Sequence, residues 1–478
     1  MTTHHLLASQ FVPRPVDDVV HFFGDPRNLA RLTPTSMGFE LLTEDLEVRD
    51  GLQIRYRIRP LLGIPATWET RITEADPPRG FVDVQARGPY RLWEHRHRFE
   101  PVDGGTLVHD AIDYRLPLGP LGDVAHALIV RRQLEWIFRY RAAAIRAIFA
   151  ASGAPTGRTI AVAGGTGFVG GGIALELHRR GHRVVVLSHE DDRQSTPLPD
   201  AVDVRRADVT TGEGLAEALR DADSVVIALA FENSPIEAPR RHQTFMEVDA
   251  GGTERVVAAA VTAGVGRVAY VSGAGAAPDS RHWFRAKWRA EQAVRGSGMT
   301  WTIVRPTWIY GARDVALNRF LGFARQLMAV PMTNLGRQQL APVFIDDVGR
   351  LIADALVDPA AEDRVFELGG PEALSMREII ATALRVADLR RPIVPGPTPL
   401  IKLGSVPLSW FRTPLLTPDA VDFINQPAVV DIDPLLEQMP RRLTPLAEGL
   451  ASYLGRSSAD ASLAIDGHVF ISRSVAAA

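Results

Sequence analysis

The sequence predicts two domains of different fold class that follow one another along 478 residues. In residues 1–150, segments with strand-like alternation are separated by turn-forming residues and followed by one long helical stretch, which is typical of an α+β domain. Over residues 158–394, strands and helices alternate, as they do in an α/β domain with a parallel sheet. A chain of this length exceeds one ordinary hydrophobic core, so its size agrees with two domains.

The first domain is expected to have a helix-grip shape, in which a curved antiparallel sheet wraps around one helix and encloses a cavity. Residues 16–23 have helical spacing, and residues 124–149 form a long closing helix with regularly spaced apolar residues. Gly104-Gly105 and Asp76-Pro77-Pro78 mark hairpin turns. The expected strands cover residues 52–58, 67–72, 80–86, 92–99 and 106–114.

Three further segments complete the predicted organisation. Residues 151–157 are small and turn-rich, so they are expected to be a linker. Residues 395–455 begin Pro-rich and become helical, which predicts a helical region on the substrate side of the second domain. Residues 456–478 are expected to be a tail.

Composition excludes several classes of function. The net charge is −3, with 53 basic against 56 acidic residues, so there is no bulk attraction to nucleic acid. The absence of cysteine excludes disulfides, thiolate nucleophiles and cysteine-ligated metals. The sequence has neither a recognisable secretory signal nor an apolar run of membrane-spanning length, so a cytoplasmic protein is expected.

A glycine-rich loop opens the second domain. Residues 163–170 read Ala-Gly-Gly-Thr-Gly-Phe-Val-Gly, after an apolar run at 159–162 and before a helical segment at 173–180. A second apolar run at 183–187 completes a unit of strand, turn, helix and strand. Glycines in such a turn let the backbone approach a pyrophosphate, whose charge lies at the N-terminus of the helix. The sequence therefore predicts a dinucleotide site in a Rossmann domain.

Further motifs follow this loop in a recognisable order. They are Gly164 to Gly170, Asp208-Val209, Ala228-Leu229-Ala230, Tyr270-Val271-Ser272, Lys287, Arg305-Pro306, Ile309-Tyr310-Gly311, Pro342 to Val348, Glu367 to Pro371 and Leu415 to Asp419. Their order resembles the extended or atypical short-chain dehydrogenase/reductase superfamily. Within it, residues 158–454 most resemble relatives of the NAD(P)H-binding accessory subunit of respiratory complex I.

This resemblance implies positions around a bound nicotinamide cofactor. Backbone amides around Thr166 to Val169 would hold the pyrophosphate. Asp208 and Val209 would flank the adenine, although an Asp at a strand end also suits a turn. Ala228 to Ala230 would line the nicotinamide-side ribose, or belong to a core strand. The residues expected to bind the cofactor are Gly164, Gly165, Thr166, Gly167, Phe168, Val169, Gly170, His189, Arg193, Asp208, Val209, Ala228, Leu229, Ala230, Ser272 and Lys287.

The end of the second strand bears on the choice between NADP and NAD. NAD-selective sites place an acid there to bind the ribose 2′-hydroxyl. Here the strand-end positions hold Ser188 and His189, and Arg193 beyond them suits a 2′-phosphate, whereas the nearby Glu190 favours NAD. We expect NADP over NAD, with both alternatives open.

The superfamily resemblance also indicates what the catalytic machinery lacks. Hydride transfer there uses a tyrosine whose pKa is lowered by a lysine four residues later. Lys287 stands at the lysine position and is the one expected catalytic residue, but Trp283 occupies the tyrosine position, and an indole N–H is no proton acid near neutral pH. Ala274 occupies the place of the expected hydroxyl donor, and Ser272 is either a near substitute or a strand-end residue. His282, next to Trp283, could act as a proton donor in place of the tyrosine, but on a helix it points about 100° away from residue 283.

The first domain carries a motif of its own. Residues 88–99 read Gly-Pro-Tyr-Arg-Leu-Trp-Glu-His-Arg-His-Arg-Phe, and with residues 113–119 and 32–34 they resemble the START-like superfamily of polyketide cyclases and lipid carriers. This resemblance implies a hydrophobic small-molecule ligand, although an ordinary core accounts for the same aromatic residues. These residues are Trp68, Trp93, Tyr114, Trp136 and Phe138.

A histidine pair in the same motif raises the question of a metal. His95 and His97 alternate along one expected strand and therefore share a face. A metal site needs a third ligand, and no partner is evident in the sequence. No metal is expected.

Two functions stay open at this point. The first is a non-catalytic protein that binds NAD(P) as a sensor or assembly factor, and Trp283 favours it. The second is an NADP-dependent reductase or epimerase that acts on a hydrophobic small molecule with a non-standard proton donor. Whether the protein is an enzyme is not decided by the sequence.

Overall fold

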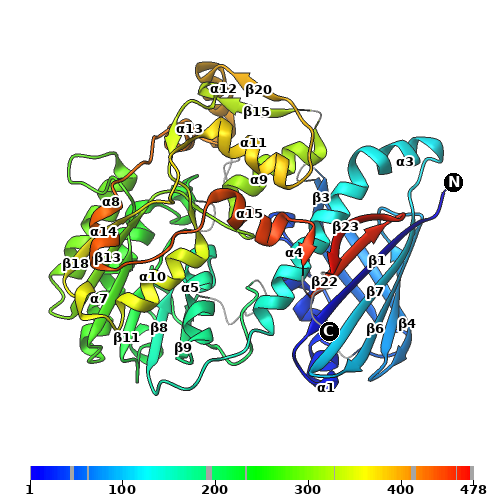
Figure 1. The fold of residues 1–478 in the computed structure, drawn as a ribbon, viewed down its shortest axis with the longest axis horizontal. Coiled ribbons are helices and arrows are strands. Elements are labelled where there is room, and N and C mark those ends of the chain that lie inside the picture. The colour runs from blue at the N-terminus through cyan, green and yellow to red at the C-terminus, as the bar shows by residue number, and fades with distance from the viewer. Residues whose placement is uncertain are drawn as a thin grey trace.

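The chain folds around two separate β-sheets that lie side by side (Figure 1). The computed structural model describes residues 2–43, 48–61, 64–189, 196–231, 234–327, 329–410, 416–458 and 460–473. One sheet is largely antiparallel and begins with the N-terminal residues, and the other is parallel. None of the described helices combines the length and the apolar character that a membrane span requires.

The antiparallel sheet has the strand order β2-β3-β4-β5-β6-β7-β1-β22-β23-β21. From β3 to β7 each strand pairs with the next one in the sequence, as the hairpin turns predict. Strand β1 then pairs with β7, from His4 opposite Tyr114 to Val12 opposite Thr106. The strands from the N-terminal part of the chain are β1 (His4–Val12), β2 (Glu40–Leu41), β3 (Gln53–Leu61), β4 (Ile64–Asp76), β5 (Gly80–Arg87), β6 (Leu92–Val102) and β7 (Gly105–Arg115).

One long helix, α4 (Arg131–Ile148), lies against this sheet. Its residues Tyr140 and Ile145 join Phe99 and Val108 of the strands in one buried core. Buried and half-buried residues alternate strictly along β7, as expected for a strand whose two faces have different surroundings. The helix expected over residues 124–149 is divided into α3, a π-helical turn and α4. The helices of this domain before α4 are α1 (Val16–Phe23), α2 (Leu29–Leu32), α3 (Pro120–Ala125) and the π-helical turn His126–Val130.

The segment that was expected to be a tail belongs to the antiparallel sheet, so this expectation was wrong. Residues 457–473 contain β21 (Ser457–Ser458), β22 (Ala461–Ile465) and β23 (His468–Arg473). Strand β22 pairs antiparallel with β1, from Leu6 opposite Ile465 to Gln10 opposite Ala461. The alternate residues Ala461, Leu463 and Ile465 are buried. An alternating pattern over only five residues was too short to predict a strand from the sequence. The strand forms because the edge of β1 carries unpaired backbone N–H and C=O groups, and residues 461–465 pair with them.

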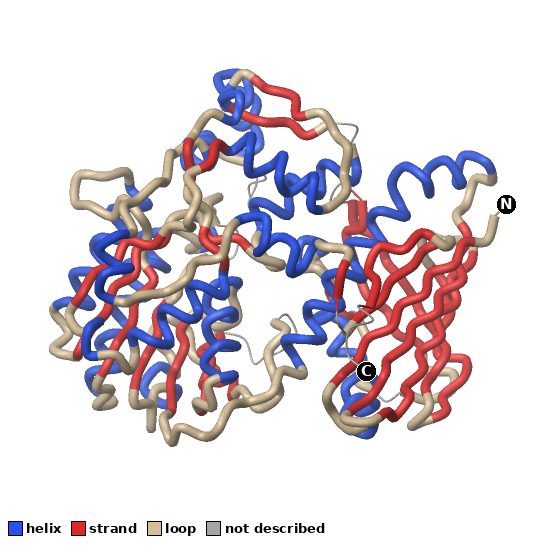
Figure 2. Tube along the Cα trace, in the orientation of Figure 1, coloured by secondary structure: helices blue, strands red, loops and turns tan. Residues whose placement is uncertain are grey.

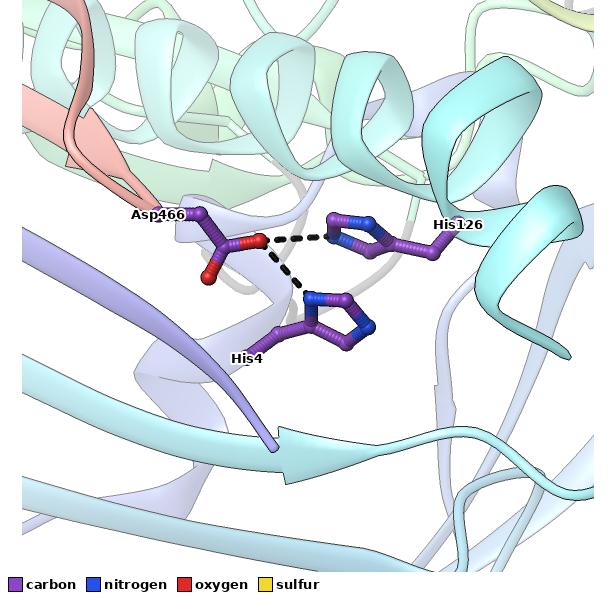
Figure 3. Close-up of side chains that lie close together, drawn as sticks. All are labelled: His4, His126 and Asp466. Atoms are coloured by element: carbon purple, nitrogen blue, oxygen red, sulfur yellow. Dashed lines mark hydrogen bonds and ion pairs between the residues drawn. The ribbon is translucent and has the colours of Figure 1, made fainter. Parts of the chain in front are cut away.

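The turn between β22 and β23 is held by a cluster of histidines around Asp466 (Figure 3). The Asp466 carboxylate lies 2.7 Å from His4 Nδ1, and it accepts a hydrogen bond of 2.8 Å from the His5 backbone N–H. The His126 ring stacks on His4 with centroids 3.5 Å apart, and its Nε2 lies 2.7 Å from the Tyr114 hydroxyl. The hairpin is therefore fixed to both β1 and the start of the helical segment.

The parallel sheet has the strand order β10-β9-β8-β11-β12-β13-β18, which confirms the predicted α/β class. Along β8, Ile160 and Val162 belong to one buried core, and Ala161 and Ala163 belong to another, so helices cover both faces (Figure 2). The strand order reverses between β8 and β11, which is where such sheets bind ligands. The strands are β8 (Thr159–Ala163), β9 (Arg183–Ser188), β10 (Asp203–Arg206), β11 (Ser224–Ile227), β12 (Arg267–Val271), β13 (Thr300–Pro306) and β18 (Arg364–Leu368), and the helices are α5 (Phe168–Arg179), α6 (Leu215–Ala218), the π-helix Phe245–Gly252, α7 (Thr253–Thr262), α8 (His282–Arg295) and α10 (Ile345–Ala355).

A smaller region of short strands and helices lies beyond one end of the parallel sheet (Figure 1). Its strands form three pairs, β14 with β17, β15 with β20, and β16 with β19. Helices α12 to α15 fall within residues 395–455, the segment that the sequence predicted to become helical. The further elements of residues 309–455 are β14 (Ile309–Tyr310), α9 (Val315–Gln326), β15 (Val330–Thr333), β16 (Gln339–Leu340), β17 (Val343–Phe344), β19 (Leu374–Ser375), α11 (Met376–Val386), β20 (Ile393–Gly396), α12 (Thr398–Ser405), α13 (Pro418–Ile424), α14 (Asp433–Gln438) and α15 (Leu446–Leu454). Of these, α14 lies beside β18 of the parallel sheet.

Buried arginines connect the two domains. Arg31 of α2 is 4% exposed; its guanidinium donates to the Leu198 carbonyl and lies 3.0 Å from the Asp200 carboxylate. Arg139 of α4 donates to the Leu454 carbonyl at the end of α15 and to the following Gly455 carbonyl, and it also holds the Phe470 carbonyl of β23 in its own domain, over 2.8 Å. A buried guanidinium needs such partners, so these contacts fix how the domains meet.

We expect acid to loosen the C-terminal hairpin. Burial and the neighbouring His4 lower the pKa of His126 from 6.5 to about 4. As the pH falls from 6.5 towards 4, the unfolded segment binds this proton before the folded one does, so the hairpin loses stability over that window and none above it. Hydrogen exchange of the β22 amides, corrected for the intrinsic rate, should show falling protection at acid pH, while the β8 amides keep theirs.

A matched variant tests the same cluster at neutral pH. Asp466→Asn weakens charge-assisted hydrogen bonds to His4 and His5, which is worth about 1.5–3 kcal/mol. Protection of β22 should therefore fall at pH 7 in this variant. Equal β22 protection at pH 4.5 and pH 7 in the unchanged protein would contradict the role given to His126.

Candidate functional site

The glycine-rich loop lies between β8 and α5, at the point where the strand order reverses. Gly164 has a φ of +81°, and a Cβ added there would lie 2.4 Å from the Ala228 carbonyl oxygen. A Cβ on Gly170 would lie 2.2 Å from the Gly164 carbonyl oxygen. Both positions therefore require glycine. Gly167 is the N-cap of α5 and places no side chain over the first turn, while residues 166–169 are at least partly exposed. Such a first turn offers free backbone N–H groups to an anion.

The carbonyl groups of this loop are held from the other side. The Thr196 hydroxyl donates to the Thr166 carbonyl over 2.6 Å. The Arg313 guanidinium donates to the same carbonyl over 3.1 Å and to the Gly167 carbonyl over 3.3 Å. Burial lowers the pKa of the Arg313 guanidinium. The loop is thus held from behind by a cation and a hydroxyl group.

The expected adenine side is only partly described. Ser188 ends β9 and is buried, and His189 follows it on the surface. Arg193 and Glu190 lie outside the described residues. The Asp208 carboxylate accepts hydrogen bonds from the Thr210 backbone N–H over 2.7 Å and from the Thr210 hydroxyl over 2.6 Å. Burial would raise the pKa of Asp208, but these hydrogen bonds lower it. Its side chain is therefore used in a turn, which was the alternative open for this residue.

The residues after β11 approach the loop closely. Ala228 faces Gly164 across the reversal point, Leu229 is buried, and Ala230 is exposed. Strand β11 ends at Ile227, so these three residues are not interior strand positions. Val209, which follows Asp208, packs against Gly252 at the start of α7. The structure therefore brings the glycine loop and residues 228–230 together.

Lys287 is bound to a buried acid that sequence reasoning missed. Its Nζ lies 2.6 Å from Asp249 Oδ1, and the Asp249 side chain is 1% exposed. The same ammonium lies 5.6 Å from the centre of the Tyr270 ring. Burial alone would lower the pKa of Lys287, but the Asp249 carboxylate raises it above its ordinary value. Asp249 lies in the π-helix before α7, where no motif marked it.

Trp283, at the tyrosine position, and Ser272, the near substitute for the hydroxyl donor, also make structural contacts. Trp283 is 2% exposed and packs edge to face against Phe423, with centroids 5.4 Å apart. The Ser272 hydroxyl donates over 2.6 Å to Glu291, a fully buried carboxylate that also accepts two hydrogen bonds of 2.8 Å from Arg305. Ser272 thus belongs to a buried ionic network, the strand-end alternative.

His282 differs from these residues because it is half-buried. Its Nε2 lies 2.9 Å from the Glu237 carboxylate. A histidine beside a carboxylate is an arrangement that can move a proton. No other imidazole of the described chain lies next to Trp283, so His282 is the remaining candidate for a proton donor.

The aromatic residues of the first domain form one partly exposed cluster. Trp68 contacts Trp93 edge to face, with centroids 5.2 Å apart, and Trp93 lies 4.8 Å from Tyr90. Tyr114 is fully buried 5.9 Å from Trp93. Trp136 of α4 joins the same cluster, while Phe138 belongs to the neighbouring core. A separate small hollow between α4 and the sheet is lined by Gln10, Val108, Asp110, Phe138, Arg141 and Ile145, among others.

His95 and His97 face the inside of the first domain, and the structure supplies the partners that the sequence did not reveal. Asp83 of β5 and Asp110 of β7 lie against both rings. These carboxylates come from the two strands that pair with β6, and so from positions 12 to 15 residues away. Only the strand pairing makes them neighbours.

Comparisons with known proteins agree with both predicted domains. Residues 3–150 match the family model described as polyketide cyclase / dehydrase and lipid transport, and residues 164–345 match the model described as NAD(P)H-binding. The chain is 29% identical over 304 residues to subunit 9 of the NADH dehydrogenase [ubiquinone] 1 alpha subcomplex of Mus musculus, which is mitochondrial; the match covers 61% of this chain and 78% of the relative. It is 27% identical over 282 residues to the mitochondrial 40 kDa subunit of Neurospora crassa NADH-ubiquinone oxidoreductase, covering 58% and 72%.

A bacterial relative and solved structures complete the comparison. The chain is 32% identical over 244 residues to the (4-alkanoyl-5-oxo-2,5-dihydrofuran-3-yl)methyl phosphate reductase of Streptomyces griseus, covering 49% of this chain and 75% of the relative. An epimerase of Methanothermobacter thermautotrophicus has a TM-score of 0.51 at 18% identity, covering 62% of this chain and 91% of that chain. UDP-glucuronic acid 4-epimerase of Bacillus cereus, solved with NAD, has a TM-score of 0.50 at 18% identity, covering 62% and 98%. These structures share the fold of the parallel sheet.

The comparisons confirm the resemblances that the motifs indicated. The parallel sheet with its glycine loop is an NAD(P)-binding domain, and the antiparallel domain in front of it is of the polyketide cyclase type. The chain therefore belongs to the NAD(P)H-binding, short-chain dehydrogenase/reductase-like family of these mitochondrial subunits and the Streptomyces reductase, and carries a polyketide cyclase-type domain fused in front.

Proposed function

We propose that the protein binds NADP(H) or NAD(H) without turning it over, and acts as a cofactor-dependent sensor or assembly factor. The observation that carries this proposal is the buried pair of Lys287 and Asp249, 2.6 Å apart, beside a Trp283 that is closed off from solvent. In the superfamily this lysine acts on the tyrosine four residues before it, and here that position holds Trp283, whose indole is no proton acid. The lysine charge is instead satisfied by a carboxylate.

Cofactor binding would use the loop that the site analysis describes. The first-turn N–H groups of α5, from Thr166 to Val169, would hold the pyrophosphate. Ala228 to Ala230 would lie beside the nicotinamide-side ribose, and Asp208 with Val209 beside the adenine. Lys287 would contact the ribose only if it left Asp249, so its binding role is the weakest of the set. Ser272 would lie beside the cofactor without donating a hydrogen bond to it, because Glu291 already accepts from its hydroxyl.

NADP fits the end of β9 better than NAD. Ser188 and His189 stand where an NAD-selective site places an acid. Neither side chain carries a negative charge, so neither would repel the 2′-phosphate of NADP. We therefore propose NADP as the preferred form, with Arg193 as the phosphate contact.

One observation favours a second function, an NADP-dependent reductase or epimerase with a non-standard proton donor. The Streptomyces relative bears the name of a reductase. In this chain the pair of His282 and Glu237, 2.9 Å apart, would have to supply the proton that the missing tyrosine cannot. The substrate would be a hydrophobic small molecule.

The first domain is proposed to be a helix-grip module that binds such a hydrophobic molecule. Support comes from the partly exposed aromatic cluster around Trp93 and from the polyketide cyclase-type match. Aromatic side chains with accessible area stabilise an apolar ligand by removing its surface from water.

A substitution in the glycine loop tests the cofactor site. In Gly167→Leu, the new side chain would cover the first turn of α5, and we expect NADPH affinity to fall on the order of 100-fold, about 2.8 kcal/mol. Fluorescence titration with NADPH and NADH measures both affinities, and NADPH should bind more tightly. Gly404→Leu is the control, because no atom lies within 4 Å of a Cβ there. Unchanged affinity in Gly167→Leu would refute the placement of the pyrophosphate.

The lysine is expected to be structural. Lys287→Met leaves Asp249 buried without a counter-charge, so the free energy of unfolding should fall by about 3–5 kcal/mol. Arg289→Met, on the same helix, breaks a more exposed pair with Glu254 and should cost no more than about 1 kcal/mol. Urea unfolding followed by tryptophan fluorescence measures both.

The same proposal predicts no hydride transfer in the unchanged protein. With bound NADPH and a broad panel of aldehydes and ketones, the absorbance of the reduced cofactor should stay constant. Turnover that is lost in His282→Gln would establish the second function in place of the first. Turnover that survives in Lys287→Met would exclude a catalytic role for this lysine.

An apolar molecule is expected to accompany the first domain. Native mass spectrometry of the purified chain should detect it, and Trp93→Ala should lose it. Trp410→Ala is the control, because Trp410 is 74% exposed and lies far along the chain in another domain. A chain that carries no such molecule, and whose fluorescence does not respond to added fatty acids or polycyclic aromatics, would contradict the proposal.

A further inference from the structure

Three neighbouring strands of the first domain bring two histidines and two carboxylates together on one face. Asp83 of β5 lies opposite His95 of β6, and His97 of β6 lies opposite Asp110 of β7. His95, His97 and Asp110 are each at most 8% exposed, and the Asp83 side chain is 13% exposed. Because water does not solvate these buried polar side chains, they need partners inside the protein.

The distances divide the ring nitrogens into two sets. Asp110 Oδ1 lies 2.9 Å from His95 Nε2 and 2.8 Å from His97 Nδ1, which are hydrogen-bond distances. Asp83 Oδ2 lies 3.6 Å from His95 Nδ1 and 3.4 Å from His97 Nε2, which is longer. A neutral imidazole carries one N–H. With that proton on the nitrogen next to Asp110 in each ring, the other two nitrogens turn lone pairs towards the Asp83 carboxylate.

Lone pairs that face a carboxylate repel it unless a cation lies between them. The charges around the rings point the same way, since Arg141 is the cation that contacts Asp110, at 3.2 Å, against two carboxylates. A negative charge in excess at a buried position is costly.

The geometry fits a four-coordinate metal ion. Zinc binds histidine nitrogen and carboxylate oxygen at about 2.0–2.2 Å, so two ligands of one tetrahedral ion are about 3.3–3.5 Å apart. The distances from Asp83 Oδ2 to the two facing nitrogens, 3.4 and 3.6 Å, are close to this separation. The three ligand atoms of Asp83, His95 and His97 lie within 4.8 Å of one another.

We propose that Asp83, His95 and His97 bind a divalent cation of the zinc type, and that Asp110 orients both imidazoles from behind. A carboxylate that bonds the second nitrogen of a ligating histidine is the usual outer partner of zinc sites. Arg141 of α4 holds Asp110 in turn, so the site joins the long helix to three strands. Imidazole and carboxylate ligands also accept cobalt, nickel and copper, and copper binds such a site most tightly of these metals.

The cluster around Asp466 serves as an internal comparison. Its His4, His126 and Asp466 could also surround an ion by distance alone. There, however, His4 Nδ1 already lies 2.7 Å from the carboxylate, and His126 Nε2 lies 2.7 Å from the Tyr114 hydroxyl. The facing nitrogens of that cluster already have hydrogen-bond partners. It is the alternative location that the experiment has to separate.

Calorimetric titration of the full chain with zinc chloride, after dialysis against a chelator and its removal, tests the proposal. We expect saturable binding of one equivalent. Asp83→Asn should weaken it more than 100-fold, and Asp110→Asn by about 10–100-fold, as expected for an outer partner. His109→Gln is the matched control, because His109 stands on β7 next to Asp110 in sequence and points to the other face, where it lies 3.4 Å from Glu100.

Three results would overturn the proposal. They are the absence of saturable binding to the unchanged chain, equal affinity in Asp83→Asn, and binding that is lost in Asp466→Asn but kept in Asp83→Asn. If Asp83→Asn fails to fold, the visible spectrum of the cobalt-loaded unchanged chain decides instead. Intense absorption of four-coordinate cobalt with nitrogen and oxygen ligands supports the site, and the weak spectrum of six-coordinate cobalt refutes it.

Discussion

A charge that leaves water has to meet an opposite charge, and this constraint shapes both domains of the protein. Lys287 meets Asp249, Arg305 meets Glu291, and Arg141 meets Asp110, each at a position that the solvent hardly reaches. Such pairs add little net stability over apolar residues of the same size, but they are expensive to break. They therefore fix which side chains are free to act on a ligand. The Rossmann domain keeps the glycine loop at the start of α5, while the ammonium of Lys287 is paired with Asp249.

Much of the architecture was predictable because it depends on local patterns. The glycine loop, the alternation of strands and helices, and the hairpin turns of the first domain are all signals of short range, and they were interpreted correctly. The missing tyrosine was visible in the same way, since Trp283 and Lys287 stand four residues apart on one helix.

The features that escaped prediction depend on pairing over long range. Asp249 reaches Lys287 from another helix, and Asp83 reaches His95 and His97 only because β5 pairs with β6 in one particular register. Residues 461–465 carry a weak strand pattern that becomes a strand only beside β1. Asp208 is the opposite case. The sequence already allowed a local turn for this residue, but only the hydrogen bonds from Thr210 show that its side chain is used in that turn.

The late entry of β22 and β23 into the first sheet gives synthesis of this chain an unusual order of events. By the time residues 1–150 have left the ribosome, strand β1 has its partner β7 on one side and still exposes its other edge. That edge stays open while some three hundred further residues are made, and an open edge can pair with a strand of another molecule. The second domain has to fold in the meantime and deliver the hairpin to the correct edge. A long sequence separation between partners slows folding, so we expect the pairing of β1 with β22 to form late.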